Sequence, residues 1–457
     1  MPLKKSRFFS VYERDGIVCL YNSLTMQCVY CKNNVYYEWN QAFQLSQDFK
    51  GSILELNNSL CEANLIIPEE ENEDELFSQI KKQIFDGVHI RVMVLQMTDY
   101  CNLHCKYCFI EGAIPKDYVR KEMPIDTAKS AVDKFISILE RDRKNIHSKP
   151  SIVFYGGEPL ANWIVVKQCL DYIDNYQKST DAIQIDKVLI TNGTLITDSI
   201  AKDLASHQVI VSVSLDGVKE AHDYNRIDEN GNGSFEKAVR GYWLLKKYGI
   251  EPGIACVLSK HSLPYAMANY HFFKDTLHVK GFGMNHVSII PNLTYYDPDY
   301  EEKYADKLLE IQENIQSDPN PIYERRMNHK INCFLNGKLM PSDCTGCGEQ
   351  ISVSTEGDIG ICQGYMGSRK TFEHTVFEKS FFPDDNEIFK EWSMRSPLNL
   401  EDCQNCPALA TCGGGCPRNA DMINGTIWKP DKAFCHFALK AQEWMIWKNM
   451  KPEMIIG

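Results

Sequence analysis

The chain has 457 residues, 44 % of them hydrophobic and 24 % charged, which is typical of a globular protein with more than one domain. Its net charge of −12 argues against nucleic acid as the main partner, because phosphate binding needs a basic face. No apolar run is long enough to predict a membrane span, and the start of the chain lacks the apolar stretch of a secretory signal. The 18 cysteines are clustered, which in such a chain favours metal ligands and a reducing cytoplasm.

Residues 1–88 are expected to form a small α+β unit. Their alternating polarity predicts short strands, with a turn at Asp15-Gly16 between the first two. The strands are expected at residues 8–12, 17–21 and 27–30, and helices near residues 38–45 and 75–85.

Residues 89–325 alternate apolar runs with amphipathic segments. Strands are expected at residues 90–97, 152–155, 188–191, 209–215, 253–258 and 281–287. Helices are expected near residues 126–141, 163–176, 198–206, 235–248 and 265–276. This alternation predicts an α/β fold with a parallel sheet and helical crossovers, either open or curved into a partial barrel.

Residues 326–457 differ from the rest of the chain. They are rich in cysteine and glycine and show little regular pattern before a final helix at residues 433–449. We therefore expect three domains, with boundaries after residues 88 and 325.

The strongest local motif is Cys101-Asn-Leu-His-Cys105-Lys-Tyr-Cys108, directly after the first strand of the α/β region. Three thiolates on one loop can bind an iron–sulfur cluster and leave one iron without a protein ligand, where a small molecule can bind. A zinc knuckle or buried thiols are the alternatives, and His104 suits a zinc site poorly at this spacing.

This motif resembles the radical S-adenosylmethionine superfamily, in which it binds a [4Fe-4S] cluster and the cofactor S-adenosylmethionine. Segments after the second, third and fourth strands extend the resemblance: Gly156-Gly157-Glu158-Pro159, Thr191-Asn192-Gly193-Thr194 and Ser214-Leu215-Asp216-Gly217. Arg226 follows Ser214 by twelve residues, as in that family. Parallel β/α barrels build their sites at this end of the strands, and the resemblance implies a partial six-stranded, TIM-like barrel.

The resemblance also implies a role for each of these residues. Tyr107 is expected against the adenine ring, and the Gly156–Pro159 loop, with Glu158, at the methionine amino group. Ser214 and Arg226 are expected at the methionine end, where an arginine suits a carboxylate. Asn192 is expected to belong to the same cofactor site.

A second cysteine array follows in the C-terminal region. Cys403, Cys406, Cys412 and Cys416 are separated by two, five and three residues, which is too tight for unrelated core residues. With Cys347, Gly357, Cys362 and Cys435, the array resembles the SPASM domain of radical enzymes that act on peptides and proteins. A zinc ribbon is the alternative.

The SPASM resemblance implies two auxiliary [4Fe-4S] clusters, and so three clusters in the chain. One is expected on Cys347, Cys362 and Cys416, with Cys344 as the fourth ligand and Cys333 as the reserve. The other is expected on Cys403, Cys406, Cys412 and Cys435. If neither Cys344 nor Cys333 binds, one iron of the first cluster is open to a substrate.

The resemblance points to a maturase of ribosomally made peptides. Sulfatase-maturating relatives carry an aspartate base directly after the cysteine that corresponds to Cys362, but here Gln363 stands there, which cannot accept a proton. Residues 1–88 are similar in layout to a winged-helix-like unit that binds a precursor's leader at a sheet edge. A structural cap on the barrel is the alternative for this unit.

The expected reaction is reductive cleavage of S-adenosylmethionine by an electron from a donor such as flavodoxin or ferredoxin. The 5′-deoxyadenosyl radical would then take a hydrogen from a precursor peptide, and a thioether or carbon–carbon crosslink would form. Formylglycine formation on a sulfatase is one alternative. A non-catalytic iron–sulfur protein for electron transfer is the other. The substrate, the bond formed and the oligomeric state do not follow from the sequence.

Overall fold

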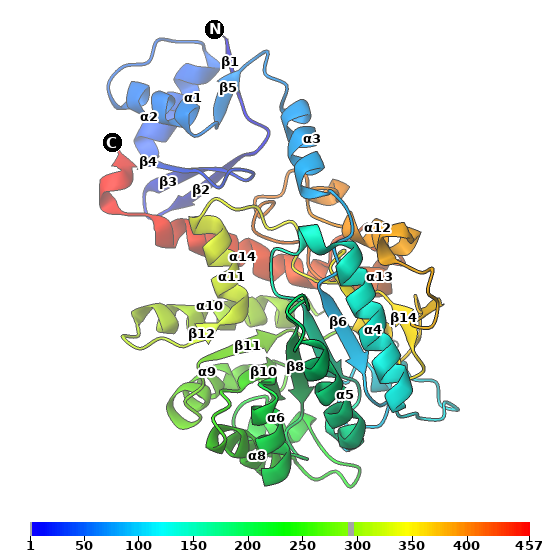
Figure 1. Ribbon diagram of the computed structural model, residues 1–457. Helices are drawn as coiled ribbons and strands as arrows, with labels where there is room; N and C mark the ends of the chain where they lie inside the picture. The colour runs from blue at the N-terminus through cyan, green and yellow to red at the C-terminus, as the bar shows by residue number, and fades with distance from the viewer. Residues whose placement is uncertain (1, 291–296) are drawn as a thin grey trace.

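The largest element of the fold is a ten-stranded sheet with the order β12-β11-β10-β9-β8-β7-β6-β13-β14-β15 (Figure 1). The structure, a computed structural model, describes residues 2–290 and 297–457. Six consecutive strands of the sheet pair in parallel: β6 (Val92–Gln96), β7 (Ser151–Tyr155), β8 (Asp186–Thr191), β9 (Ile210–Ser214), β10 (Gly253–Val257) and β11 (Gly281–Asn285). The six strands expected from the sequence are confirmed, and so is the parallel α/β architecture.

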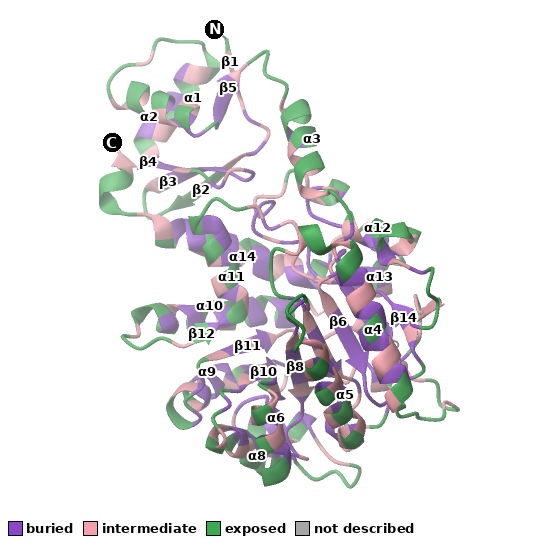
Figure 2. Cartoon of the chain, viewed as in Figure 1, coloured by how far each residue is buried: buried purple, intermediate pink, exposed green. Residues whose placement is uncertain are grey.

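Helices cross over between these strands and cover the sheet. They are α4 (Ile125–Arg141), α5 (Trp163–Tyr176), α6 (Asp198–Ser206), α8 (Phe235–Lys247) and α9 (Ala266–His271). Figure 2 shows the strands largely buried and the outer faces of these helices exposed. Leu95, Phe154 and Leu189, on three adjacent strands, are fully buried in the main core. In β7 to β11, buried residues alternate with less buried ones, so one face of the sheet is fully covered and the other is partly open.

The sheet extends beyond the six expected strands. β12 (Tyr323–Glu324) pairs in parallel with β11, and β13 (Gln350–Val353) pairs in parallel with β6. β14 (Asp358–Gly360) and β15 (His374–Thr375) continue it as antiparallel strands. Residues 350–375 show no regular pattern in the sequence, because strands this short leave almost no periodicity.

The N-terminal unit contains a four-stranded sheet of order β16-β4-β3-β2. Its members are β2 (Phe9–Arg14), β3 (Ile17–Asn22), β4 (Cys28–Lys32) and, from the other end of the chain, β16 (Ile455–Ile456). α1 (Asn33–Gln44), α2 (Ser52–Glu62) and α3 (Glu73–Ile84) follow, and β1 (Leu3–Lys5) pairs with β5 (Ile66–Pro68). The sheet therefore ends at the six-residue β2 on one side and at the two-residue β16 on the other, and β2 has no strand partner on its outer side within the described residues.

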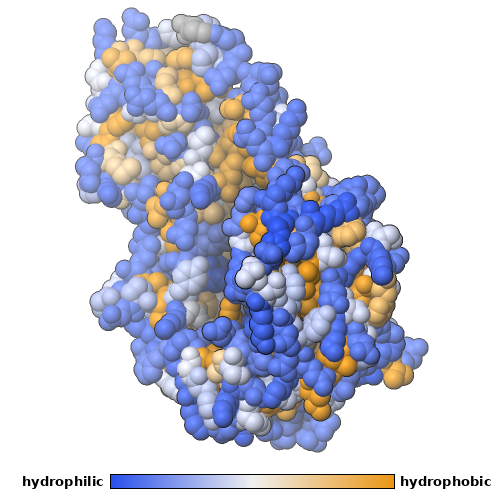
Figure 3. Space-filling view, viewed as in Figure 1, coloured by the Kyte–Doolittle hydropathy of each residue, from blue (hydrophilic) through white to orange (hydrophobic). Residues whose placement is uncertain are grey.

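Two apolar clusters attach the N-terminal unit to the C-terminal region. Tyr30 and its neighbours pack against α14 (Lys432–Asn449), and the Tyr30 hydroxyl donates to the Ile446 carbonyl at 2.6 Å. Phe77 of α3 packs in a second cluster with Leu409. Figure 3 shows apolar side chains gathered beside α3, where this unit meets the larger body.

The remaining helices are α7 (Lys219–Asn225), α10 (Pro298–Ser317), α11 (Arg325–Leu335), α12 (Glu387–Ser393) and α13 (Pro417–Asn424). α14, expected from the sequence, is confirmed and packs along α10. Among the described residues, no helix has the length and apolar character that crossing a membrane requires.

Candidate functional site

The three cysteines of the first motif lie on a loop beyond the carboxyl end of β6. Cys101, Cys105 and Cys108 are half-buried. Burial raises the pKa of Cys105 to about 12; the charge of Arg226 opposes this rise and that of Cys108 adds to it. The structure thus brings the three thiols into one group, as the spacing predicted.

The donors of this group, three thiols on one loop, suit a [4Fe-4S] cluster. Within residues 2–290 and 297–457, no three histidine, cysteine, aspartate or glutamate side chains converge tightly enough to hold one metal ion. A four-iron cubane is wider than one ion, so its thiolate ligands stand farther apart. Backbone N–H groups also point at two of the sulfurs: Leu103 at Cys101 and Glu111 at Cys108, both at 3.4 Å, and such bonds tune cluster potentials.

The Gly156–Pro159 loop packs directly onto the cysteine loop. A Cβ on Gly157 would lie 2.2 Å from the carbonyl oxygen of Tyr100, so only glycine fits there. The Glu158 N–H donates to the same carbonyl at 2.9 Å. These glycines therefore permit a close approach between two segments of the chain, beside any contact with a cofactor.

The Glu158 carboxylate links the second and third strand ends. It is buried and accepts hydrogen bonds from the Thr191 hydroxyl and the Asn192 N–H, both at 2.7 Å, and from the Leu160 N–H at 3.1 Å. Burial raises its pKa to about 7. The carboxylate is thus satisfied largely by the chain itself, and it fixes the loop that carries Asn192.

Asn192 reaches back to the cysteine loop. Its side-chain N–H group donates to Asn102 at 2.9 Å and lies 3.9 Å from the Cys101 sulfur. Residues from the ends of β6, β7 and β8 therefore meet at one place, which is the arrangement that the motifs predicted.

Arg226 forms a buried ion pair that the sequence analysis did not identify. Its Nε and one terminal nitrogen lie 3.1 Å from the two carboxylate oxygens of Asp216, which is fully buried. The Tyr107 hydroxyl also donates to Asp216, and the Arg226 guanidinium lies 5.5 Å from the Tyr107 ring centre. Ser214 ends β9 two residues before Asp216. Asp216 belongs to the Ser-Leu-Asp-Gly segment, so the motif contained it but did not indicate its partner.

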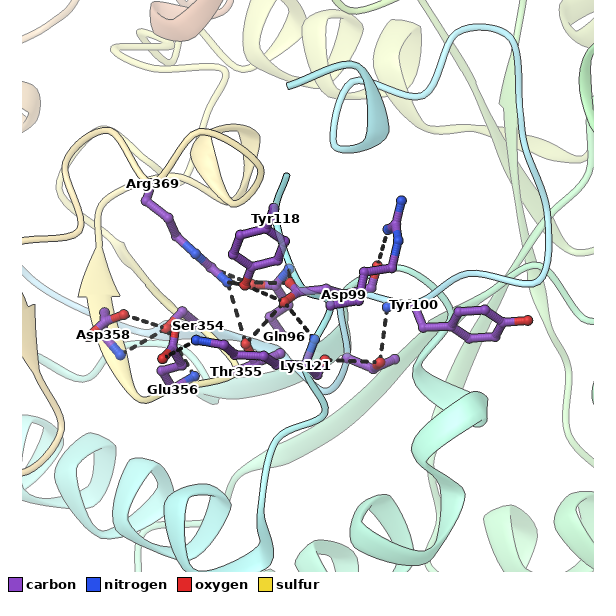
Figure 4. A network of polar contacts seen from close by, with 12 residues as sticks. Gln96, Asp99, Tyr100, Tyr118, Lys121, Ser354, Thr355, Glu356, Asp358 and Arg369 are labelled. Atoms are coloured by element: carbon purple, nitrogen blue, oxygen red, sulfur yellow. Dashed lines mark hydrogen bonds and ion pairs between the residues drawn. The ribbon is translucent and has the colours of Figure 1, made fainter. Parts of the chain in front are cut away.

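A second network that the sequence did not reveal holds the base of the cysteine loop (Figure 4). Asp99 directly precedes Tyr100 and Cys101, and it accepts hydrogen bonds from Gln96 and Tyr118, both at 2.6 Å. Arg369, seven residues after Cys362, lies 3.3 Å from Asp99 and donates to Gln96 at 2.6 Å. Arg369 has a left-handed φ of 56°, a conformation that persists where its surroundings fix it.

The C-terminal cysteines form two groups in the structure. The first contains Cys344, Cys347, Cys362 and Cys416. A hydrogen bond between two of its thiols raises the pKa of Cys344 and lowers that of Cys347. Burial raises the pKa of Cys362, and the nearby charges of Cys344 and Cys416 raise it further.

Cys333 stands apart from this first group. It lies on α11, and burial raises its pKa; the charges of Lys330 and Lys338 oppose this rise and that of Asp343 adds to it, and none of these groups is a cysteine. Of the two candidates for the fourth ligand, the structure brings Cys344 into the group.

The second group contains Cys403, Cys406, Cys412 and Cys435. Burial raises the pKa of Cys403 to about 12; the charges of Cys412 and Cys406 raise it further and that of Arg395 opposes this. Burial likewise raises the pKa of Cys435, and the charges of the other three cysteines add to it.

One turn, Gly413-Gly414-Gly415, joins the two groups. All three glycines have positive φ, and a Cβ on Gly413 would lie 2.6 Å from the Asp343 nitrogen. The turn therefore places Cys412 and Cys416 in different groups although only three residues separate them.

Comparison with known proteins identifies the α/β region. Residues 95–261 match the sequence family described as the radical SAM superfamily. The radical SAM cyclopropyl synthase TigE of Paramaledivibacter caminithermalis is 26 % identical over 84 % of this chain and 80 % of its own length. A cysteine-type anaerobic sulfatase-maturating enzyme of Clostridium perfringens is 26 % identical over 73 % of this chain and 90 % of its own.

Solved structures show the same fold. The sulfatase-maturating enzyme anSMEcpe with bound AdoMet matches with a TM-score of 0.63 at 24 % identity, covering 78 % of this chain and 97 % of that one. Streptococcus suis SuiB bound to precursor peptide SuiA matches with a TM-score of 0.54 at 15 % identity, covering 95 % of this chain and 99 % of SuiB. The domain match and the enzyme relatives show that this protein is an enzyme with a radical SAM domain at residues 95–261, which implies a [4Fe-4S] cluster and S-adenosylmethionine as cofactors.

Proposed function

We propose that this radical SAM enzyme is a peptide maturase that crosslinks a ribosomally made precursor. The observation that carries the proposal is the N-terminal unit, whose β2 edge is free and whose body is packed onto the cysteine-rich region. The fold of SuiB covers 95 % of this chain, whereas that of the sulfatase-maturating enzyme covers 78 %. This difference supports an N-terminal unit like that of SuiB, the neighbour that is bound to a precursor peptide.

In this proposal, Cys101, Cys105 and Cys108 hold the cluster that binds S-adenosylmethionine. When bound, that cluster supplies the electron that splits the cofactor into methionine and a 5′-deoxyadenosyl radical. The chain's own contribution is to orient the cofactor and to hold the site rigid. The residues assigned to cofactor binding are Tyr107, Gly156, Gly157, Glu158, Pro159, Asn192, Ser214 and Arg226.

The structure refines two of these assignments. The carboxylate of Glu158 accepts three hydrogen bonds from the chain, so its main task is to fix the loop of Asn192 beside Cys101. Arg226 is held in place by Asp216, which also orients Tyr107. Asp216 is therefore a positioning residue of the cofactor site.

Two auxiliary clusters complete the proposal. Cys344, Cys347, Cys362 and Cys416 would hold one of them. Cys403, Cys406, Cys412 and Cys435 would hold the other. The donors are thiols in groups of four, which suits [4Fe-4S] clusters without an open iron.

Gln363, the residue after Cys362, favours peptide crosslinking over formylglycine formation. Gln363 is half-buried, and its side-chain oxygen accepts a hydrogen bond from Gln350 at 2.6 Å. A neutral amide held in this way cannot act as a base. Formylglycine formation remains the second candidate because of the likeness to sulfatase-maturating enzymes over 73 % of the chain.

Mass spectrometry of a co-expressed small peptide encoded beside this protein tests the proposal. A crosslink removes two hydrogen atoms from the peptide, and fragmentation is expected to be blocked between the joined residues. The variant with Cys101, Cys105 and Cys108 all changed to alanine is the control and is expected to leave the peptide unchanged.

Two outcomes would contradict peptide crosslinking. One is a peptide of unchanged mass in the presence of fully loaded enzyme. The other is an aldehyde in a sulfatase-derived cysteine or serine peptide, which would establish the second candidate.

A further inference from the structure

Arg395 is a fully buried cation without an acidic partner. Its Nε donates to the carbonyl of Ile427 at 2.8 Å, and its terminal nitrogens donate to those of Gly414 at 2.9 Å and Lys429 at 3.3 Å. None of the ion pairs found among the described residues includes Arg395. Its charge is therefore met only by the dipoles of backbone carbonyl groups.

This arrangement is costly for an arginine in particular. A buried charge is unfavourable unless an opposite charge compensates it, and a guanidinium cannot lose its proton to escape the cost. Lys134 shows the contrast. It is also buried and donates to the Glu378 carbonyl at 2.7 Å, but burial lowers its pKa. Arg395 has no carboxylate partner among the described residues, so its charge is uncompensated in the chain as it stands.

The position of Arg395 indicates where that charge lies. Gly414, one of its acceptors, is the middle residue of the turn that joins Cys412 of the second cysteine group to Cys416 of the first. The carboxylate of Asp431 flanks this turn but forms no ion pair with Arg395. One of its oxygens accepts from the Cys416 N–H at 3.1 Å and from Asn419 at 3.2 Å, and the other is buried without a hydrogen-bond partner among the described residues. Because Arg395 is bonded to the turn itself, its charge lies beside both cysteine groups.

We propose that Arg395 is the shared counter-charge of the two auxiliary clusters and that it raises the reduction potential of both. The inference rests on the proposed auxiliary clusters. A cluster held by four thiolates is negatively charged and becomes more so on reduction, so a fixed cation in a medium of low dielectric constant stabilises the reduced form more.

Lys330 provides an internal comparison. It is buried on α11, and its ammonium group donates to the carbonyls of Thr411 and Cys412, both at 2.9 Å. Both carbonyls belong to the segment of the second cysteine group. Lys330 is therefore expected to influence one auxiliary cluster, whereas Arg395 influences both.

A redox titration followed by electron paramagnetic resonance tests the proposal. The background protein carries alanine at Cys101, Cys105 and Cys108, so that the auxiliary clusters alone give the signal. Its iron content is measured first and is expected to be about eight per chain. Arg395→Gln is expected to lower the reduction equilibrium constant of both clusters by about tenfold, equivalent to about 59 mV for a one-electron couple.

Three further variants separate charge from structure. Arg395→Lys keeps the charge and is expected to retain most of the potential. Lys330→Gln is expected to shift one cluster only. Lys134→Gln, a buried cation bonded to carbonyls of residues 378 and 379, is the control and is expected to shift neither.

The outcomes are distinct. A fully loaded Arg395→Gln protein with unchanged potentials overturns the proposal. If that variant binds little iron, the thermal stability of the iron-free proteins decides. An iron-free Arg395→Gln protein as stable as the iron-free parent supports a charge role. If the substitution lowers the stability equally with and without iron, the proposal is overturned. A background protein without auxiliary iron would overturn the cluster assignment itself.

Discussion

Single side chains in the cofactor site have partners that the motifs do not contain. The sequence predicted Tyr107, Glu158 and Arg226 as site residues from their spacing after successive strands. Asp216 binds two of them, and it could be predicted only as part of a motif, because an ion pair is a property of the folded chain. Arg369 was not predicted at all, since its contact with Asp99 joins residues 270 apart in the sequence.

The buried carboxylate of Glu158 predicts a pH dependence of stability. Its pKa is about 7 in the folded chain against an ordinary 4.5, so the native state binds more protons than the unfolded state between these values. Its contribution to stability is therefore present below pH 4.5 and is lost as the pH rises through 7. We compare the free energy of unfolding of the iron-free wild type with that of iron-free Glu158→Gln. The difference is expected to fall as the pH rises across this range, by up to about 1.4 kcal/mol for each unit of pKa shift.

Chemical denaturation at a series of pH values measures this difference. Asp198→Asn serves as the control, because Asp198 is exposed on α6 and its hydrogen bond with Lys247 lowers its pKa. Stability from a lowered pKa is lost only as the pH falls through that pKa, so this control is expected to be flat above pH 5. A wild-type curve parallel to that of Glu158→Gln would show that Glu158 keeps an ordinary pKa.

At the scale of elements, local pattern was sufficient where a strand lies in the central sheet or a helix is long. The six parallel strands and their crossover helices were predicted, as was α14. β13 was not, because its four residues pair with β6 across more than 250 positions of the chain, and such pairing has no local signature. α1 begins at Asn33, five residues before the expected start, because its first turn has no acidic residue and no side-chain cap to mark it.

The free edge of β2 gives a test of leader binding. Val11 lies in the middle of β2 and is 44 % exposed. Successive residues of an edge strand direct their N–H groups to opposite sides. Of the two single variants Ser10→Pro and Val11→Pro, one therefore removes an N–H that pairs with β3, and the other removes an N–H that faces outward. The substitution that leaves the melting temperature unchanged is expected to weaken binding of the precursor's leader, measured by calorimetry, at least tenfold.

The same variant provides its own control. It is expected to cleave S-adenosylmethionine without peptide at the wild-type rate, because β2 is remote in the chain from the cysteine loop. Normal leader affinity in that stable variant would show that the peptide binds elsewhere and would favour the cap as the role of this unit.

At the scale of the whole molecule, the three expected domains share elements. β16, from the end of the chain, completes the N-terminal sheet, and β13, from the cysteine-rich region, extends the sheet of the α/β region. The domain boundaries after residues 88 and 325 therefore stay a prediction. A chain that returns to an earlier sheet cannot be detected from composition, because each returning strand is only two to four residues long.

The formation of 5′-deoxyadenosine tests the central claim most directly. The reconstituted enzyme, with about twelve irons per chain, is incubated with S-adenosylmethionine and a strong reductant, and the products are separated by chromatography. We predict 5′-deoxyadenosine and methionine from the wild type, and neither from the variant with alanine at Cys101, Cys105 and Cys108, which is expected to keep about eight irons. Equal cleavage by both proteins, or a colourless zinc-loaded wild type, would contradict the account.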